Sequence, residues 1–435
     1  MPVKMASSIA GRRGAAGSPQ AAVNVAGDSA PPPAIRARRI DSVDLLRGVI
    51  MVIMMLDHTR DFVHRDAFVF DPTDVARTYP FLFFTRWVTH FCAPIFVFLA
   101  GTGVYFQRMR GKPLGELSRL LVTRGLWFIA LELVVFRILI FFNADFGVLF
   151  GFLQVIWAIG WSLIVLAGVI HLPLRVIVPM SIAVIALHNT LDGVHVTTWA
   201  GPGTPVPGFG AGLWHVLHQR GVIFPFGASG PAVLALYPLI PWIAVMWAGY
   251  ALGSLYERTD LERRRRLLGL GAALIVGFVV IRAINIYGDP SPWSAQDTLV
   301  KSMLSFLAVS KYPPSLLYLL MTLGPALVFL AAFDDRARGA IARTFITFGR
   351  VPMFFYLLQW VISHGLAIAA LKVVGQPTDY LYGDLGFGPP PPPGFGFGLA
   401  TVYALWILGL ILIYPLCVWF AGVKARRRDW WLSYV

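Results

Sequence analysis

The sequence predicts an all-α integral membrane protein, a polytopic bundle of about ten transmembrane helices with both termini in the cytoplasm. Three observations support this prediction: a low charged fraction, apolar segments that recur along the chain, and basic residues concentrated in alternate loops. Of the 435 residues, 57% are hydrophobic and 13% are charged, whereas soluble domains contain about 25% charged residues. Together with a mean hydropathy of +0.69, this composition excludes an ordinary water-soluble domain.

The apolar segments set the predicted number of spans. A helix needs about 20 mainly apolar residues to cross the hydrocarbon core of a bilayer. The predicted spans are 45–63, 82–106, 119–142, 147–170, 173–190, 232–255, 267–287, 313–333, 351–373 and 398–421. The apolar stretch 299–311 is too short to cross, so we expect it to form a re-entrant or interfacial piece.

The loops between these spans predict the orientation, because cytoplasmic loops are rich in Lys and Arg. The predicted inner loops contain Arg108, Arg110, Lys112, Arg119, Arg175, Arg258, Arg263 to Arg266, Arg336, Arg338, Arg343 and Arg350. The outer loop 191–231 contains only Arg220, and the outer loop 375–397 contains neither Lys nor Arg. The basic residues that give the net charge of +14 therefore orient the helices in the membrane, and we expect no nucleic-acid partner.

Three regions are predicted along the chain. Residues 1–39 are rich in Ala, Gly, Pro and Ser, as expected of a disordered cytoplasmic tail, and they lack the apolar core of a signal peptide. Residues 40–423 form the predicted transmembrane domain, and residues 424–435 form a basic cytoplasmic tail.

Ionisable residues inside the spans are the candidates for function, because a charge is costly in the bilayer core. Arg47 and His58 are eleven residues apart in the first span. At about 100° per residue they lie on one face of a helix, roughly 16 Å apart along its axis. Such a pair would mark the two ends of a path along the helix. An ordinary snorkelling arginine and a structural histidine are the simpler interpretations of the same two residues.

Other polar residues in the spans indicate one hydrated cavity that faces outward. They are Asp57, Arg60, Arg86, His90, Glu132, Arg282, Asn285, Lys311 and His364. A histidine there can take up and return a proton near neutral pH, and Asp61 is spaced to orient His58. Structural ion pairs, such as Glu132 with Arg137 or Arg86, are an alternative for part of this set. The sequence shows no zinc-ligand spacing, so no metal is predicted.

The start of the predicted domain resembles transmembrane acyltransferases. Residues 39–48 (RIDSVDLLRG) precede an apolar helix that ends in Asp57 and His58, and the spacing from Arg47 to His58 matches the signature of the acyltransferase-3 family. The segments 85–101, 237–253, 310–324 and 349–358 are similar to bacterial members of the heparan-alpha-glucosaminide N-acetyltransferase catalytic-domain family. The likeness extends over residues 39–421.

This resemblance implies transfer of an acetyl or other acyl group from cytoplasmic acyl-CoA to an acceptor beyond the membrane, such as an envelope saccharide. It implies that Arg47 lies at the entry of the donor and that His58 is catalytic. In the heparan family, however, an asparagine matches His58 and the catalytic histidine lies just beyond the first span, so His64 is a second candidate. The implied location is the bacterial cytoplasmic (inner) membrane. The resemblance leaves open whether the protein forms a homodimer.

Two other classes of function fit the same residues. A proton-coupled secondary transporter or exporter would use Asp57, His58 and Glu132 as a proton relay. Such transporters often contain paired halves with broken helices, and the sequence shows no such internal symmetry. A non-catalytic scaffold would keep only the fold.

Overall fold

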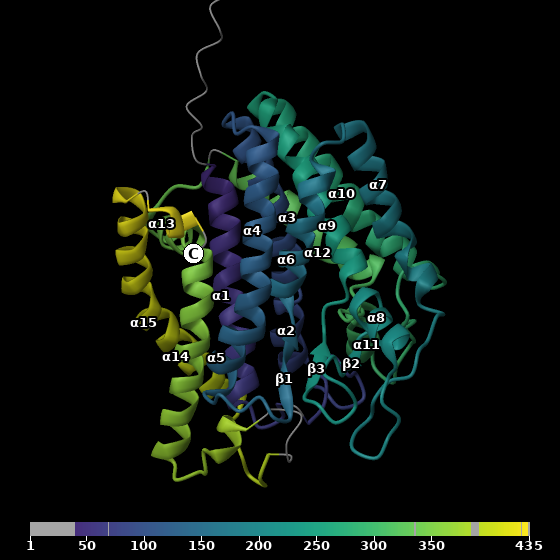
Figure 1. Ribbon diagram of the computed structural model, residues 1–435, viewed down its shortest axis with the longest axis vertical. Coiled ribbons are helices and arrows are strands. Elements are labelled where there is room, and N and C mark those ends of the chain that lie inside the picture. The colour runs from purple at the N-terminus through teal and green to yellow at the C-terminus, as the bar shows by residue number, and fades with distance from the viewer. Residues whose placement is uncertain (1–39, 68, 335, 384–390, 428, 434–435) are drawn as a thin grey trace, which may run out of the picture. The chain divides into compact units, whose positions relative to one another are not determined.

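The computed structural model describes residues 40–67, 69–334, 336–383, 391–427 and 429–433, and they are mainly helical (Figure 1). The predicted tail 1–39 lies outside the described residues, as do residues 428, 434 and 435 of the predicted tail 424–435. Both tails therefore stay predictions.

Fifteen α-helices are assigned in the described part of the chain. They are α1 (Asp41–Val63), α2 (Pro80–Thr89), α3 (Cys92–Met109), α4 (Leu114–Ala130), α5 (Arg137–Phe141), α6 (Val155–Val169), α7 (Leu174–Leu187), α8 (Phe209–Leu217), α9 (Leu239–Leu252), α10 (Asp260–Ile284), α11 (Leu299–Leu307), α12 (Leu316–Phe333), α13 (Ala340–Arg350), α14 (Pro352–Val373) and α15 (Leu399–Arg426). A π-helical segment, η1 (Leu131–Phe136), joins α4 to α5.

Helix α1 is surrounded by other helices. It contacts α2, α3, α12, α13, α14 and α15, and 17 of its 23 residues are buried. A helix enclosed on this scale does not present its charges to lipid. The charged and polar residues of α1 therefore lie in the interior of the protein, where they need partners from neighbouring helices.

Glycines bring α1 close to α13. A Cβ atom at Gly48 would lie 1.8 Å from the carbonyl oxygen of Phe345, and one at Gly349 would lie 1.9 Å from the carbonyl oxygen of Asp44. The close approach lets Arg47 donate from Nη1 to the Gly349 carbonyl at 3.1 Å and to Asp44 Oδ1 at 2.9 Å. Arg47 therefore joins the first turns of α1 to the end of α13.

Seven helices in the described part of the chain are long and apolar enough to cross a membrane. They are Pro80–Met109, Leu174–Leu191, Leu239–Glu257, Asp260–Ile284, Leu316–Phe333, Pro352–Val373 and Leu399–Arg426. In the most apolar windows of α10 and α15 only 22% of residues are buried, against 67% for α12. The chain is therefore a multi-pass membrane protein in which α10 and α15 present broad apolar faces outward.

Three predicted spans are not among these seven. The span 45–63 corresponds to α1, which carries Arg47, Asp57, Arg60 and Asp61. The span 119–142 is interrupted by the π-helical segment η1. The span 147–170 contains a helix of only 15 residues, α6, because a strand occupies its start. The count of ten spans and the location of the termini stay predictions.

A small sheet corrects the all-α expectation. Strand β1 (Leu149–Leu153) pairs in parallel with β3 (Ala232–Ala235), and β3 pairs antiparallel with β2 (Gly221–Ile223). The strands β1 and β3 fall at the starts of two predicted spans, since a short apolar run does not reveal by periodicity alone whether it is strand or helix. Figure 1 shows the sheet, α8 and α11 toward one end of the helices and α13 toward the other.

The contact between α1 and α13 gives a first testable prediction. Gly48→Ala should destabilise the protein by about 1–3 kcal/mol, because the added methyl group overlaps main-chain atoms and forces the helices apart. Gly103→Ala in α3 is the matched control, since a Cβ atom there meets nothing within 4 Å, and it should be neutral or stabilise by up to about 1 kcal/mol. Thermal unfolding in detergent measures both, and equal midpoints for the two variants would contradict this packing.

Candidate active site

An ion network occupies the C-terminal half of α1. Asp57 accepts a hydrogen bond at Oδ2 from Arg86 Nη1 of α2 at 2.5 Å, and its Oδ1 lies 3.0 Å from Arg60 Nη2. Arg60 also donates to Asp61 Oδ1 at 2.5 Å. Because Asp57 is only 8% exposed and Arg60 only 4%, each charge depends on these partners. Both oxygens of Asp57 are thus engaged by arginines.

His58 is held by α14. Its Nδ1 lies 2.8 Å from Gln359 Oε1, and its ring stacks on Trp360 with 3.8 Å between centroids. Gln359 Nε2 donates to the Tyr356 carbonyl, so the amide oxygen faces His58 and the histidine donates from Nδ1. The lone pair of Nε2 is then free, and Nε2 has no hydrogen-bond partner among the described residues. The hydrogen-bond partner of the ring is Gln359, and an orienting role of Asp61 stays a prediction.

His64 uses its Nδ1 in the opposite way to His58, as a hydrogen-bond acceptor. It follows the last residue of α1, and its Nδ1 accepts a hydrogen bond from the backbone N–H of Asp66 at 3.2 Å. Burial lowers the pKa of His64, which favours the neutral ring. A neutral imidazole has one nitrogen lone pair in the ring plane, and in His64 that lone pair is engaged by the main chain.

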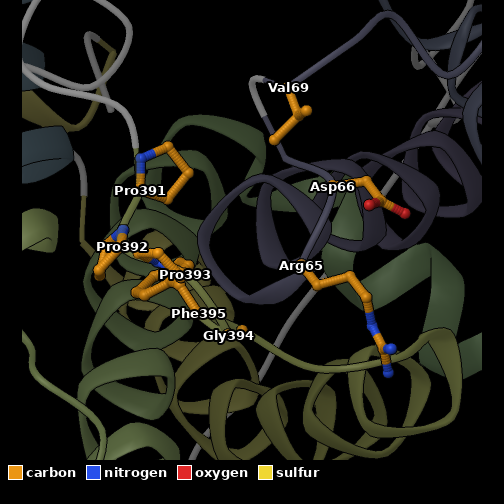
Figure 2. A pocket seen from close by; sticks show the side chains of 9 residues that line it. Arg65, Asp66, Val69, Pro391, Pro392, Pro393, Gly394 and Phe395 are labelled. Carbon is orange, nitrogen blue, oxygen red and sulfur yellow. The ribbon is translucent and has the colours of Figure 1, made fainter.

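A surface cleft of about 460 Å³ lies just after the end of α1 (Figure 2). Arg65, Asp66 and Val69 line one side of it, and residues 391–396 line the other. The main chain joins these two segments, because Phe397 donates to the Val63 carbonyl at 2.8 Å and Arg65 donates to the Phe397 carbonyl at 3.0 Å. His64 is therefore part of the main-chain bridge between the end of α1 and Phe397, just before α15.

Two further predicted residues lie near Asp57. His90 donates from Nδ1 to the Arg86 carbonyl at 2.9 Å, where the helix breaks between α2 and α3. Lys311 precedes α12 and is 9% exposed, and its charge lies close enough to interact electrostatically with Asp57, His58 and His90. The assignment of these residues to one substrate cavity stays a prediction.

The remaining predicted residues lie in other surroundings. Glu132 accepts a hydrogen bond from the Trp157 backbone N–H at 3.0 Å at the start of α6, whereas Arg86 pairs with Asp57. His364 is fully buried between the rings of Phe62 and Phe142, with centroids 4.6 Å and 4.0 Å away.

Arg282 and Asn285 belong to a separate cluster with main-chain groups. Arg282 donates to the carbonyls of Ser291, Ser305, Phe306 and Ala308, and Asn285 pairs with the backbone of Trp293. These contacts satisfy the guanidinium within its own segment of the chain. The sequence analysis had placed both residues in the substrate cavity.

Gln359, Trp360 and Tyr356 are the site residues that sequence reasoning missed. Gln359 is an uncharged amide in an apolar span, and it is completely buried. A search for ionisable residues passes over such a group, although a buried amide also requires hydrogen-bond partners. The need of a buried amide for hydrogen-bond partners was the signal in the sequence that could have identified Gln359. No group of three His, Cys, Asp or Glu side chains in the described ranges is placed to hold a metal ion.

The fold and the buried polar cluster define a multi-pass membrane protein with a histidine in its interior. A family model described as heparan-alpha-glucosaminide N-acetyltransferase, catalytic, matches residues 39–286, more than half of the chain. The chain therefore belongs to this family and is a transmembrane acetyltransferase. The match includes His58 and Arg86 and ends before Lys311 and Gln359. No curated protein matches the chain.

The ion network predicts a large loss of stability on removal of Asp57. Asp57→Asn should lower the free energy of unfolding by about 3–5 kcal/mol, because it leaves Arg60 and Arg86 buried without their shared carboxylate. Asp260→Asn is the control, since Asp260 is 73% exposed and its partner Arg263 keeps Asp334 at 2.7 Å. That change should cost about 0–1 kcal/mol. Denaturant unfolding in micelles compares the two, and similar losses would argue against a buried network.

Proposed function

We propose that this protein transfers an acetyl or related acyl group from cytoplasmic acyl-CoA to an acceptor on the opposite side of the membrane. The acceptor is an envelope saccharide or a similar hydroxyl or amine compound, and the location is the bacterial cytoplasmic membrane. One observation carries the proposal: Gln359 holds His58 by Nδ1 at 2.8 Å and leaves Nε2 free, next to buried cationic residues. Membership in an acetyltransferase family supports the type of reaction.

The orientation follows from the charges. The end of the protein at α13 would face the cytoplasm, because Arg336, Arg338, Arg343 and Arg350 lie in or next to this helix. Arg47 lies at that end and keeps part of its guanidinium accessible, since its side chain is 19% exposed. Arg47 would bind the phosphates of the donor, which suit a guanidinium. All ten predicted spans would then run between this face and the opposite one.

In the proposed reaction His58 acts as general base. The acceptor oxygen or nitrogen bonds to the thioester carbonyl carbon while its proton passes to His58 Nε2. The C–S bond then breaks, and the thiolate of CoA takes that proton from Nε2. The products are the acylated acceptor and CoA with a free thiol, and His58 returns to its starting form.

A covalent route uses the same nitrogen. Nε2 would bond to the acyl carbon while the C–S bond breaks, and the CoA thiolate would take a proton from solvent. The acceptor would then bond to the acyl carbon while the Nε2–acyl bond breaks, and its proton would pass to solvent. Release of one equivalent of CoA per protein without acceptor would identify this route. In both routes the reacting nitrogen must have a free lone pair, which His58 Nε2 has and His64 Nδ1 does not.

The choice between the two histidines is testable. His58→Ala should reduce acetyl transfer by about 10²–10⁴-fold, because it removes the base, whereas His64→Ala should keep most of the activity. The assay follows label from [¹⁴C]acetyl-CoA into an envelope saccharide extract, with purified protein in micelles and thermal unfolding as a folding control. Full transfer by His58→Ala would refute the assignment, and loss in His64→Ala alone would transfer it to His64.

The role of Gln359 is a separate prediction. Gln359→Leu removes the acceptor that fixes the tautomer of His58, so kcat should fall by about 10- to 100-fold while KM for acetyl-CoA changes little. Gln359→Glu should retain more activity than the leucine variant, because a carboxylate also accepts from Nδ1. Steady-state kinetics on folded variants decide this, and equal activity of leucine and wild type would exclude a positioning role.

A further inference from the structure

Lys311 is a largely buried cation that is not paired directly with a carboxylate in the described part of the chain. It is 9% exposed, and its ammonium has no hydrogen-bond or ion-pair partner among the described residues. The ring of Tyr312 lies 5.3 Å from Nζ. A positive charge in mostly buried surroundings without a paired anion is costly, so an oxyanion that forms beside it would be stabilised.

The buried carboxylate of Asp57 is already paired with other cations. Asp57 is shared by Arg86 at 2.5 Å and Arg60 at 3.0 Å, so its two oxygens already have cationic partners. The start of α12, just after Lys311, reaches the ion network. The hydroxyl of Tyr318 donates to the His90 carbonyl at 2.7 Å, and His90 donates to the Arg86 carbonyl at 2.9 Å. The charge of Lys311 also acts on Asp57 and His58. An acyl group that reacts at His58 would therefore lie near the positive charge of Lys311.

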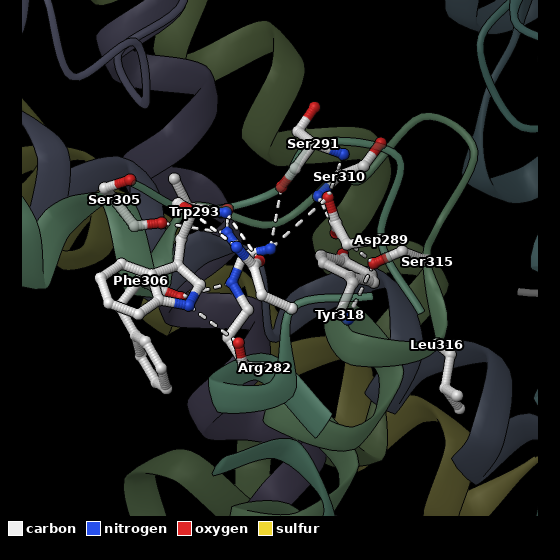
Figure 3. Close-up of polar contacts among 12 residues, drawn as sticks. Arg282, Asp289, Ser291, Trp293, Ser305, Phe306, Ser310, Ser315, Leu316 and Tyr318 are labelled. Atoms are coloured by element: carbon white, nitrogen blue, oxygen red, sulfur yellow. Dashed lines mark hydrogen bonds and ion pairs between the residues drawn. The ribbon is translucent and has the colours of Figure 1, made fainter. Parts of the chain in front are cut away.

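The loop 310–315, which carries Lys311, is fixed at both ends. Asp289 Oδ2 accepts from the backbone N–H of Ser310 at 2.8 Å and from the hydroxyl of Ser315 at 2.6 Å (Figure 3). Ser315 in turn caps α12 by accepting from the backbone N–H of Tyr318 at 3.0 Å. The carbonyl of Pro314 also lies 2.8 Å from His188 Nε2.

The segment before this loop is anchored by Arg282. This buried residue donates to the carbonyls of Ser305, Phe306 and Ala308 at the end of α11, and Nη1 lies 3.9 Å from Asp289 Oδ1. Figure 3 shows Arg282 and Asp289 on neighbouring sides of the same cluster. The cluster thus orders the chain on both sides of Lys311, although it offers no reactive group of its own.

We propose that Lys311 is a catalytic residue that donates a hydrogen bond to the acyl carbonyl oxygen, and that Asp289 is a positioning residue for the loop that carries it. This inference rests on the proposed function. When the acceptor attacks, the carbonyl π electrons move to oxygen and form a tetrahedral oxyanion. The ammonium stabilises this charge and keeps its protons. The electrons return when the C–S bond breaks.

The test begins with Lys311→Cys in purified full-length protein, with [¹⁴C]acetyl-CoA as donor and glucosamine plus an envelope saccharide extract as acceptors. We expect kcat to fall by about 100-fold or more, with KM for acetyl-CoA within about threefold of wild type. Lys301→Cys on α11 is the matched control, because Lys301 has no role in the proposed site and should keep wild-type kcat.

Chemical rescue separates catalysis from folding. Treatment with 2-bromoethylamine forms a C–S bond to the new thiol with loss of bromide, and it restores a primary amine of nearly lysine length. The treated Lys311→Cys variant should recover at least about tenfold in kcat, as expected for regained oxyanion stabilisation. Treated wild type controls for reaction at the native cysteines Cys92 and Cys417, which are both buried.

A double-mutant cycle tests Asp289. Asp289→Asn should lower kcat by about tenfold in the wild-type background and have almost no further effect in Lys311→Met, because both changes act through the same ammonium. Additive losses would assign Asp289 a purely structural role and overturn that part of the proposal.

The outcomes distinguish this inference from the proposed function. If Lys311→Met stays within threefold of wild type while His58→Ala is inactive, the inference is wrong and the acetyl transfer stands. Loss without rescue by aminoethylation also counts against it. If wild-type protein transfers no label to either acceptor, the proposed function itself is wrong, whatever the role of Lys311.

Discussion

The structure depends on the cost of a charge in the interior of a membrane protein. Helix α1 carries Asp57, His58, Arg60 and Asp61 within five consecutive residues, and no bilayer-exposed helix accommodates such a run without large expense. Two features reduce this cost. Other helices enclose α1, and Arg86 from α2 and Arg60 from α1 share the carboxylate of Asp57. The helices that form this enclosure are α2, α3 and α12 to α15.

Helix packing determines where the enclosed charges lie. Glycines at the contact of α1 with α13 remove the side-chain layer between the two helices, so the start of α1 is fixed laterally. At its other end, His58 stacks on Trp360 and bonds to Gln359, both from α14. Because α1 is one continuous helix, fixing both ends also fixes the distance between Arg47 and His58.

Much of this arrangement could be predicted from periodicity and charge. The placement of Arg47 and His58 on one continuous helix follows from their spacing, and the need of Asp57 for a cationic partner follows from electrostatics. Gln359 could not be found in this way, because it is uncharged and 301 residues from its partner. Arg282 illustrates the reverse case: its charge marked it as a cavity residue, whereas its guanidinium donates to four main-chain carbonyls, three of them at the end of α11. The strands β1 and β3 were missed because short apolar runs suit both a sheet and a helix.

The sequence distances between partners have a consequence for biosynthesis. The ion network closes early, since Arg60 is in α1 itself and Arg86 follows Asp57 by only 29 residues. The partner of His58 is synthesised 301 residues later, which takes about 15–60 s at about 5–20 residues per second. The nascent protein can therefore neutralise its most costly charge soon after α1 enters the membrane. The reactive histidine acquires its orientation only when α14 arrives, so an incomplete chain would hold its ion network before it could react.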